Sequence, residues 1–145
     1  MANGCIFCEI VAKDAPASFV REDALTVAFI DTRQFHLGHI LVVPKAHLAD
    51  IRELDGETGA ALMAAVVDVT RAVSSALSCQ GISVWNSNGE AAGQEVPHLH
   101  FHVHPRWQSD RLLEVYPSPP GSPDRATLDA LAASIRPHLL SGSAA

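Results

Sequence analysis

Four histidines alternate with apolar residues in a single run of the chain, within residues 93–106, GQEVPHLHFHVHPR. The histidines are His98, His100, His102 and His104, and the residues between them are Leu99, Phe101 and Val103. Successive side chains of a β-strand point to opposite faces. The alternation therefore predicts a strand, ended by Pro105, with its imidazoles on one face and its apolar residues toward a core. Neighbouring imidazoles on that face lie roughly 7 Å apart, twice the rise per residue.

Imidazole can act near neutral pH as a nucleophile, an acid, a base or a metal ligand. Three interpretations of the run follow: a solvated strand face, a His-x-His metal site, or a site for phosphoryl or nucleotidyl transfer. Strict alternation of several histidines makes the first a poor explanation. The preceding loop, SNGEAAGQ at residues 87–94, offers small residues and backbone N–H groups that suit phosphate oxygens. This loop favours phosphoryl transfer.

The rest of the pattern predicts an α+β fold built on an antiparallel sheet. Residues 56–78 have the clearest helical periodicity, with Leu62, Val66, Val69, Val73 and Leu77 on one stripe. Asp55 is the expected N-cap of this helix. A second helix is expected to start at Ser122 and Pro123, with Pro137 disturbing its last turn. We further expect a helical turn at 5–12 and strands at 24–31, 38–43 and 81–85.

Length and charge limit the class of protein. The chain has 145 residues, about one domain, and 48% of them are hydrophobic. A net charge of −6 argues against broad contact with a nucleic-acid backbone but leaves room for a small anionic ligand. No uninterrupted apolar run approaches the roughly 18 residues of a membrane span, and the N-terminus does not resemble a signal peptide. We therefore expect a cytoplasmic protein without a membrane partner.

Three cysteines, an odd number, argue against a disulfide framework. Cys5 and Cys8 form a C-x-x-C pair. Such a pair is either a redox motif or half of a zinc site. A redox motif should follow a strand within a βαβ unit, whereas this pair lies at the start of the chain, and a zinc site needs two further ligands.

Together these motifs resemble the histidine-triad (HIT) family of nucleotide hydrolases and transferases, whose motif is His-x-His-x-His followed by two apolar residues. The resemblance also includes CIFCEI, AFIDTRQFHLGHILVVPKAH and NGEAAGQ, and covers roughly residues 5–106. It implies a HIT-like fold over a single domain, 1–145, with a motif-bearing core at 5–106 and a variable C-terminal extension at 107–145. It also implies a homodimer.

The resemblance assigns the chemistry to three histidines. His100 matches the nucleophile, which attacks the α-phosphorus of a nucleoside phosphate derivative and forms a covalent nucleotidyl-histidine. His102 matches the histidine that contacts the phosphate, and His39 matches the one that supports the nucleophile. The remaining substrate-binding matches are Asp31 for the ribose, Phe29 and Ile30 for the base, and Ser87, Asn88, Gly93, Gln94, Glu95 and Val96 for the phosphate region.

Members of the family with a CIFC start often carry a structural zinc, and the resemblance implies Cys5, Cys8, His47 and His98 as its ligands. Two positions depart from the family pattern. Glu95 stands where some relatives have a hydroxyl residue that donates to the phosphate or the leaving group. His104 replaces an apolar residue, and we expect it to be a partly exposed histidine at the strand end.

We therefore expect a homodimeric hydrolase of purine nucleoside phosphoramidates or dinucleoside polyphosphates. Two alternatives stay open. One is a nucleotide-binding regulatory protein with little turnover. The other is a zinc enzyme that uses its histidines as catalytic ligands, which needs an open coordination position that four protein ligands would close.

Overall fold

The structure is a computed structural model, and it describes residues 4–112 and 120–139. Its contacts divide the chain into two units, residues 1–112 and residues 113–145. The first unit contains the whole motif-bearing core. A single domain over all 145 residues stays a prediction, and parts of the expected extension, residues 113–119 and 140–145, lie outside the described residues.

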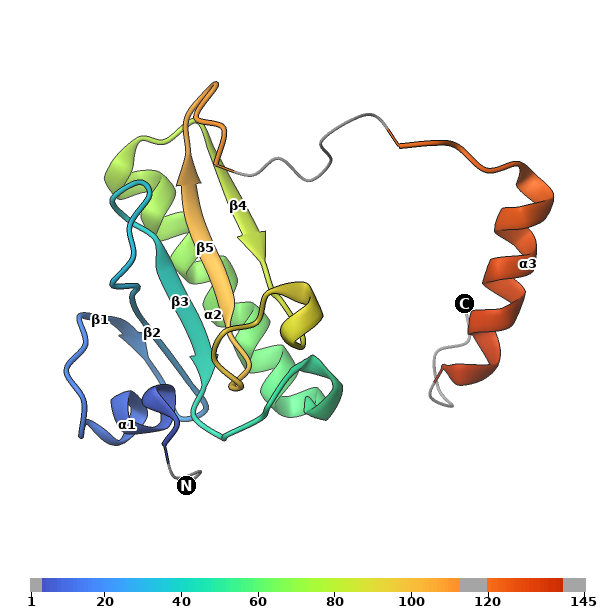
Figure 1. Cartoon of the computed structure of the whole chain (residues 1–145). Coiled ribbons are helices and arrows are strands. Elements are labelled where there is room, and N and C mark those ends of the chain that lie inside the picture. Colours follow the sequence, from blue (N-terminus) through green and yellow to red (C-terminus); the bar gives the residue numbers. More distant parts are fainter. Residues whose placement is uncertain (1–3, 113–119, 140–145) are drawn as a thin grey trace. The chain divides into compact units, whose positions relative to one another are not determined.

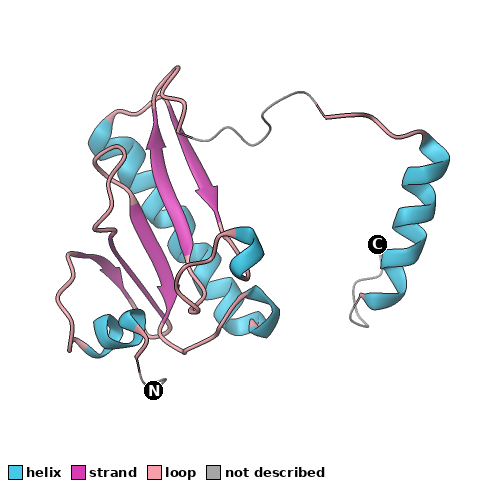
Figure 2. Ribbon diagram, in the orientation of Figure 1, coloured by secondary structure: helices cyan, strands magenta, loops and turns pink. Residues whose placement is uncertain are grey.

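One antiparallel sheet organises the first unit, with the strand order β1-β2-β3-β5-β4 (Figure 1). Figure 2 distinguishes the strands of the sheet from the helices and loops. The strands are β1 (Phe19–Glu22), β2 (Thr26–Ile30), β3 (Ile40–Pro44), β4 (Gly81–Trp85) and β5 (Phe101–Arg106). The expected α+β class is confirmed. β1 was not expected from the sequence, because it has only four residues, FVRE, and these do not alternate between hydrophobic and polar.

Two helices cover the sheet, α1 (Ile6–Ala12) and α2 (Gly56–Leu77). The predicted N-cap of α2 is confirmed, since the Asp55 carboxylate accepts a hydrogen bond from the backbone N–H of Thr58 at 2.8 Å. The predicted apolar stripe is buried except at its last residue, Leu77. α2 crosses one face of the sheet, where it contacts β2, β3 and β5 (Figure 1).

Length and composition alone would also let α2 span a membrane, since an 18-residue window has a mean hydropathy of 1.5. Asp68 and Arg71 interrupt this window, and both are exposed. The apolar side of the helix belongs to the core of the sheet. In this structure the hydrophobicity of α2 is therefore that of a core helix.

β2 and β3 are buried on both faces of the sheet, which explains their nearly continuous apolar sequence. Ala28, Ile40 and Val42 point to the face covered by α2 and join its hydrophobic core. Their neighbours point to the opposite face and pack with α1: Val27, Phe29, Leu41 and Val43. The sheet thus separates two cores, and α1 covers only part of the second face.

The histidine run is only partly a strand. β5 begins at Phe101, three residues later than expected, and it includes Pro105. The pairing with β3 starts where Phe101 faces Val42. The backbone before Phe101 does not pair with β3 but with the loop that follows β3, since the N–H of Leu99 donates to the carbonyl of Leu48 at 2.7 Å. Alternation nevertheless holds, because Leu99 and Val103 enter the core under α2.

The described part of the second unit is a single helix, α3 (Arg125–Ile135), followed by a short 3-10 turn at Arg136–His138. The helix begins later than the expected start at Ser122, because Asp124 provides the cap by accepting from the N–H of Thr127 at 2.8 Å. Pro137 ends the regular helix as predicted, because proline lacks the N–H that helix hydrogen bonding needs.

Truncating one buried residue of α2 tests the packing of this helix. Leu62 is 1% exposed and lies in the core, whereas its neighbour Met63 is 49% exposed. We expect Leu62→Ala to lower the free energy of unfolding by about 2–5 kcal/mol, because it leaves a cavity between helix and sheet. Met63→Ala is the matched control and should change it by less than about 0.5 kcal/mol. Urea denaturation followed by circular dichroism measures both, and equal losses would contradict the packing of α2.

Candidate functional site

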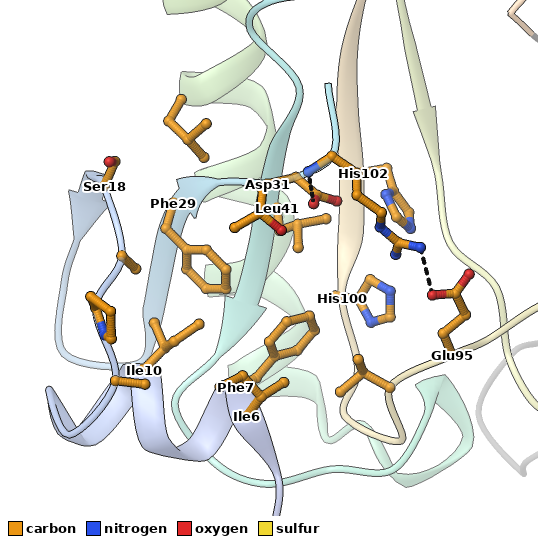
Figure 3. Close-up of a pocket in the computed structure, with 17 residues that line it drawn as sticks. Ile6, Phe7, Ile10, Ser18, Phe29, Asp31, Leu41, Glu95, His100 and His102 are labelled. Atoms are coloured by element: carbon orange, nitrogen blue, oxygen red, sulfur yellow. Dashed lines mark hydrogen bonds and ion pairs between the residues drawn. The ribbon is translucent and has the colours of Figure 1, made fainter. Parts of the chain in front are cut away.

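A cavity of about 650 Å³ opens beside the histidine run. Its walls differ in chemistry (Figure 3). The hydrophobic side chains of Ile6, Phe7, Ile10 and Phe29 gather at one end, and Glu95, His100 and His102 lie at the other. Asp31 lies between the two ends. Such a cavity suits a ligand with an apolar ring at one end and a reactive polar group at the other.

His100 is held with one ring nitrogen toward the backbone. Its Nδ1 lies 2.7 Å from the carbonyl oxygen of His98. Since a carbonyl only accepts, Nδ1 carries the proton, and Nε2 keeps a lone pair. Burial lowers the pKa of His100, so the ring is neutral near pH 7. Asn86, which the sequence did not single out, supports this segment by donating to the carbonyl of His100 at 2.8 Å.

A chain of hydrogen bonds fixes the ring of His102. The Nδ1 of His39 donates to the carbonyl of Arg33 at 3.0 Å, which leaves Nε2 of His39 as an acceptor. This nitrogen lies 2.9 Å from Nδ1 of His102, which therefore donates to it. The lone pair of His102 is then on Nε2. His39 does not line the large cavity and acts on it through His102.

The Asp31 carboxylate sits at the end of β2 and is 6% exposed. One oxygen accepts from the backbone N–H of Arg33 at 2.8 Å, and the other lies 3.5 Å from Nδ1 of His39. Each carboxylate oxygen therefore keeps a lone pair that can accept a hydrogen bond from a ligand. A carboxylate held in this way can accept hydrogen bonds from two neighbouring hydroxyl groups.

The loop before the histidine run contributes less to the cavity than expected. Of its expected ligand-binding residues, Glu95 and Val96 line the cavity, whereas Ser87, Asn88, Gly93 and Gln94 do not. The Gln94 side chain instead donates to the carbonyls of Ala49 and Val96, and Asn88 accepts from the N–H of Ile51. These amides hold the loop in place.

The four residues expected to bind zinc are brought together. Their ligand atoms, on Cys5, Cys8, His47 and His98, all lie within 4.8 Å of one another. Nδ1 of His98 is 3.5 Å from the Cys5 sulfur, and Nδ1 of His47 is 3.3 Å from the Cys8 sulfur. Tetrahedral zinc with bonds of about 2.3 Å to sulfur and about 2.1 Å to nitrogen gives S···N edges of about 3.6 Å.

The orientation of His98 also fits a metal. Its Nε2 lies 2.9 Å from the carbonyl of Pro44, to which it donates, so Nδ1 keeps the lone pair that a metal needs. Burial lowers the pKa of His98, which favours the neutral ring. The donor set, its spacing and this tautomer therefore fit a closed tetrahedral zinc site.

The expectation for His104 was wrong, because this residue is 1% exposed. Its ring packs against His39 with centroids 4.8 Å apart, and against Trp85 at 5.9 Å. Burial lowers the pKa of His104. His104 lines a second, smaller cavity of about 250 Å³, which shares Asp31, Arg33 and His102 with the first.

Several cavity residues were missed by reasoning from the sequence. The apolar end uses α1, through Ile6, Phe7 and Ile10, which was expected only to carry the metal ligands. Arg33 was missed as well, although it follows the expected ribose-binding Asp31 by two positions. A basic residue in a loop directly after a ligand-binding strand end is a signal that could have found it.

A family model described as HIT domain matches residues 12–109. The chain belongs to the HIT family. It is 40% identical over 121 residues to adenosine 5'-monophosphoramidase hnt1 of Schizosaccharomyces pombe, covering 83% of this chain and 88% of that protein. It is 31% identical over 112 residues to adenylylsulfatase HINT3 of Arabidopsis thaliana, covering 77% of this chain and 57% of that protein.

Solved structures of HIT proteins share the fold. A HIT family protein from Bacillus subtilis superposes with a TM-score of 0.90 at 34% identity, covering 97% of this chain and 100% of that one. A zinc-bound histidine triad family protein from Mycobacterium smegmatis superposes with a TM-score of 0.71 at 36% identity, covering 90% and 97%. The expected HIT-like fold is confirmed, and the Cys5, Cys8, His47 and His98 group fits the zinc-carrying branch.

The buried state of His102 predicts a pH-dependent stability. Burial, together with His100 and His39, lowers the pKa of His102 from 6.5 to about 4. Between these values the unfolded chain binds a proton at this ring and the folded chain does not, so the free energy of unfolding falls as the pH falls through this window. His102→Gln should flatten the decrease, as measured by urea denaturation from pH 6.5 to 4.

The exposed His138 provides the control for this variant. His138→Gln should reproduce the pH dependence of the wild type over the same window. If His102→Gln and the wild type show the same slope of the free energy of unfolding against pH, His102 titrates alike in the folded and unfolded chains, which would contradict the expectation.

Proposed function

We propose that this protein is a hydrolase that cleaves purine nucleoside phosphoramidates or dinucleoside polyphosphates at the α-phosphate through a covalent nucleotidyl-His100. The observation that carries the proposal is the hydrogen bond from Nδ1 of His100 to the His98 carbonyl, on a ring that lines the cavity. It leaves the lone pair of Nε2 as a nucleophile, and a neutral imidazole is both a good nucleophile and a good leaving group at phosphorus. The hydrolases among its relatives act on nucleotide derivatives, as their names state.

The bound substrate would place its base among Ile6, Phe7, Ile10 and Phe29, with Ile30 beside them. Asp31 would accept hydrogen bonds from the ribose hydroxyls. The α-phosphate would then lie at the His100 end of the cavity. The polarity of the cavity wall increases from the apolar end to the His100 end, and the polarity of a nucleotide increases in the same way from base to sugar to phosphate.

The reaction would proceed in two displacements. Nε2 of His100 forms a bond to the α-phosphorus while the bond to the leaving group breaks, and the leaving group departs with the bonding electrons and takes up a proton from solvent. A phosphate anion beside His102 favours the protonated imidazole, whose Nε2–H then donates to a phosphate oxygen. Water next attacks phosphorus and gives up a proton to solvent, the P–N bond breaks, and the nucleoside monophosphate leaves while Nε2 of His100 regains its lone pair.

Removing the nucleophile tests the proposal. His100→Asn keeps an N–H that can donate to the His98 carbonyl, but an amide has no nucleophilic nitrogen that could attack phosphorus. On adenosine 5'-phosphoramidate and diadenosine polyphosphates we expect turnover to fall by three orders of magnitude or more, on the order of the losses seen when other hydrolases lose their nucleophile. Intact-mass measurement of the wild type after rapid quenching should detect a nucleotidyl adduct that the variant lacks.

His138→Asn makes the same exchange at an exposed position and should retain wild-type turnover. Equal turnover in His100→Asn and the wild type would remove His100 from its role. Tight nucleotide binding with no turnover of any member of the panel would favour the regulatory alternative.

We propose further that zinc is the resident metal of the Cys5, Cys8, His47 and His98 site, where it supplies structural cross-linking. Protein purified without a tag should contain about one zinc per chain, as four-ligand structural sites do. Cys8→Ser should lose the metal and unfold at a lower temperature, because α1 is then no longer tied to the sheet. Metal analysis and calorimetry measure both effects, and Cys79→Ser is the control. A metal-free wild type would refute the site.

The resemblance and the acidic net charge of −6 extend the proposal to a cytoplasmic homodimer that binds neither nucleic acid nor membrane. The homodimer follows from the resemblance alone.

A further inference from the structure

One ion pair stands at the reactive end of the cavity. Nη1 of Arg33 lies 2.7 Å from Oε2 of Glu95, and both residues line the cavity with His100 and His102. Figure 3 draws this contact as a dashed line that reaches Glu95 beside His100. The two residues come from different loops, Arg33 from the one after β2 and Glu95 from the one before β5.

The backbones of both residues are anchored although their side chains are exposed. Arg33 donates its N–H to Asp31 and accepts from His39 through its carbonyl. Glu95 lies between Gln94, whose side chain ties the loop to Ala49, and Val96, whose carbonyl accepts from Gln94. The two charges are therefore held at the rim of the cavity by the same contacts that build the site.

The side chains themselves can exchange partners. They are 70% and 67% exposed, and a solvated pair of this kind contributes little to stability. A ligand charge at the rim competes with this small energy. The Arg33–Glu95 pair is thus a weak contact, and it lies within reach of the substituent on the α-phosphate.

The formal charges that line the cavity do not favour an anion. Among the described residues that line it, those with a formal charge are Asp31, Arg33 and Glu95, and their net charge is −1. Glu95 thus neutralises Arg33, the cavity's one guanidinium among those residues. Without Glu95 the rim would present a free cation to an incoming anion.

We propose that the Arg33–Glu95 pair selects ligands by the charge of the substituent on the α-phosphate. Neutral substituents leave the pair intact. Cationic substituents are favoured over anionic ones, because the charged residues that line the cavity have a net charge of −1 and the α-phosphate adds a further negative charge. Anionic substituents, including the polyphosphate chain of a dinucleoside polyphosphate, are therefore disfavoured, and within the proposed substrate class the inference favours phosphoramidates. The inference rests on the proposed function for the location of the phosphate.

Charge removal from either partner has opposite consequences. Glu95→Gln removes the carboxylate and frees Arg33 for anionic substituents. Arg33→Gln leaves the carboxylate unpaired and strengthens the discrimination against anions. A pair that only held the loops together would shift the affinity for all ligands alike.

The test uses three esters of adenosine 5'-monophosphate with substituents of similar size: propyl, 2-aminoethyl and carboxymethyl. Their dissociation constants are measured by titration calorimetry in the His100→Asn background, so that turnover does not interfere. In that background the carboxymethyl ester should bind more weakly than the aminoethyl ester. Glu95→Gln should strengthen carboxymethyl binding and weaken aminoethyl binding, each about two- to fivefold, and Arg33→Gln should do the reverse.

The propyl ester carries only the phosphate charge that all three esters share, so it reports any change that does not depend on the substituent, and the shifts of the other two esters are measured relative to it. Glu90→Gln removes the same charge from an exposed position of the same loop, outside the cavity lining, and should leave all three affinities unchanged. High salt should reduce the discrimination, since about 1 M salt screens charges beyond about 3 Å.

Equal shifts in Glu95→Gln and Glu90→Gln, or a common shift for all three esters, would overturn the inference. The outcome is separate from that of the hydrolase proposal. Charge-dependent binding without turnover in the wild type would refute the hydrolase and retain the selection by Arg33 and Glu95. Failure of all three esters to bind would overturn the inference, whereas the hydrolase proposal is decided by the turnover of the wild type and His100→Asn.

Discussion

His98 is the residue on which the geometry of the site depends. Its Nε2 donates to the Pro44 carbonyl, which turns Nδ1 toward Cys5 and Cys8. Its own carbonyl accepts from Nδ1 of His100 and so selects the tautomer of the neighbouring ring. One fully buried residue thus links the metal-binding group to the orientation of His100. The ring of His98 has partners for both nitrogens and therefore little freedom to turn. This holds the residue in place, so its carbonyl is a fixed acceptor for Nδ1 of His100.

The two-sided sheet explains why this arrangement forms. α2 packs across one face, and the short α1 covers only part of the other. The cavity occupies the uncovered part of this face. Phe7 belongs to the core between α1 and the sheet and also contacts His100, with the two ring centroids 5.2 Å apart. Burial beside Phe7 therefore contributes to the low pKa of His100, because an apolar environment disfavours the charged ring.

Periodicity predicted most of the fold, and family resemblance predicted the residues of the site. The helix at 56–77 and the two central strands follow from patterns within the segments themselves. The start of β5 could not be predicted, because it depends on where Leu99 finds the Leu48 carbonyl. The amides of Asn88 and Gln94 were assigned to the substrate but hold the loop, since a sequence does not reveal which polar group a buried carbonyl will find.

The location of Arg33 and Glu95 at the rim follows from the energetics of the cavity. The apolar end would recognise a ligand through apolar contact, which discriminates poorly between similar rings. Charges placed there would lose hydration and would have to be paired permanently. At the exposed rim a charge pair stays hydrated, so it can exchange one partner for a ligand group at small cost. Selection by charge is therefore possible only at the end of the cavity where water remains, which is also the end where the leaving group of the proposed reaction would depart.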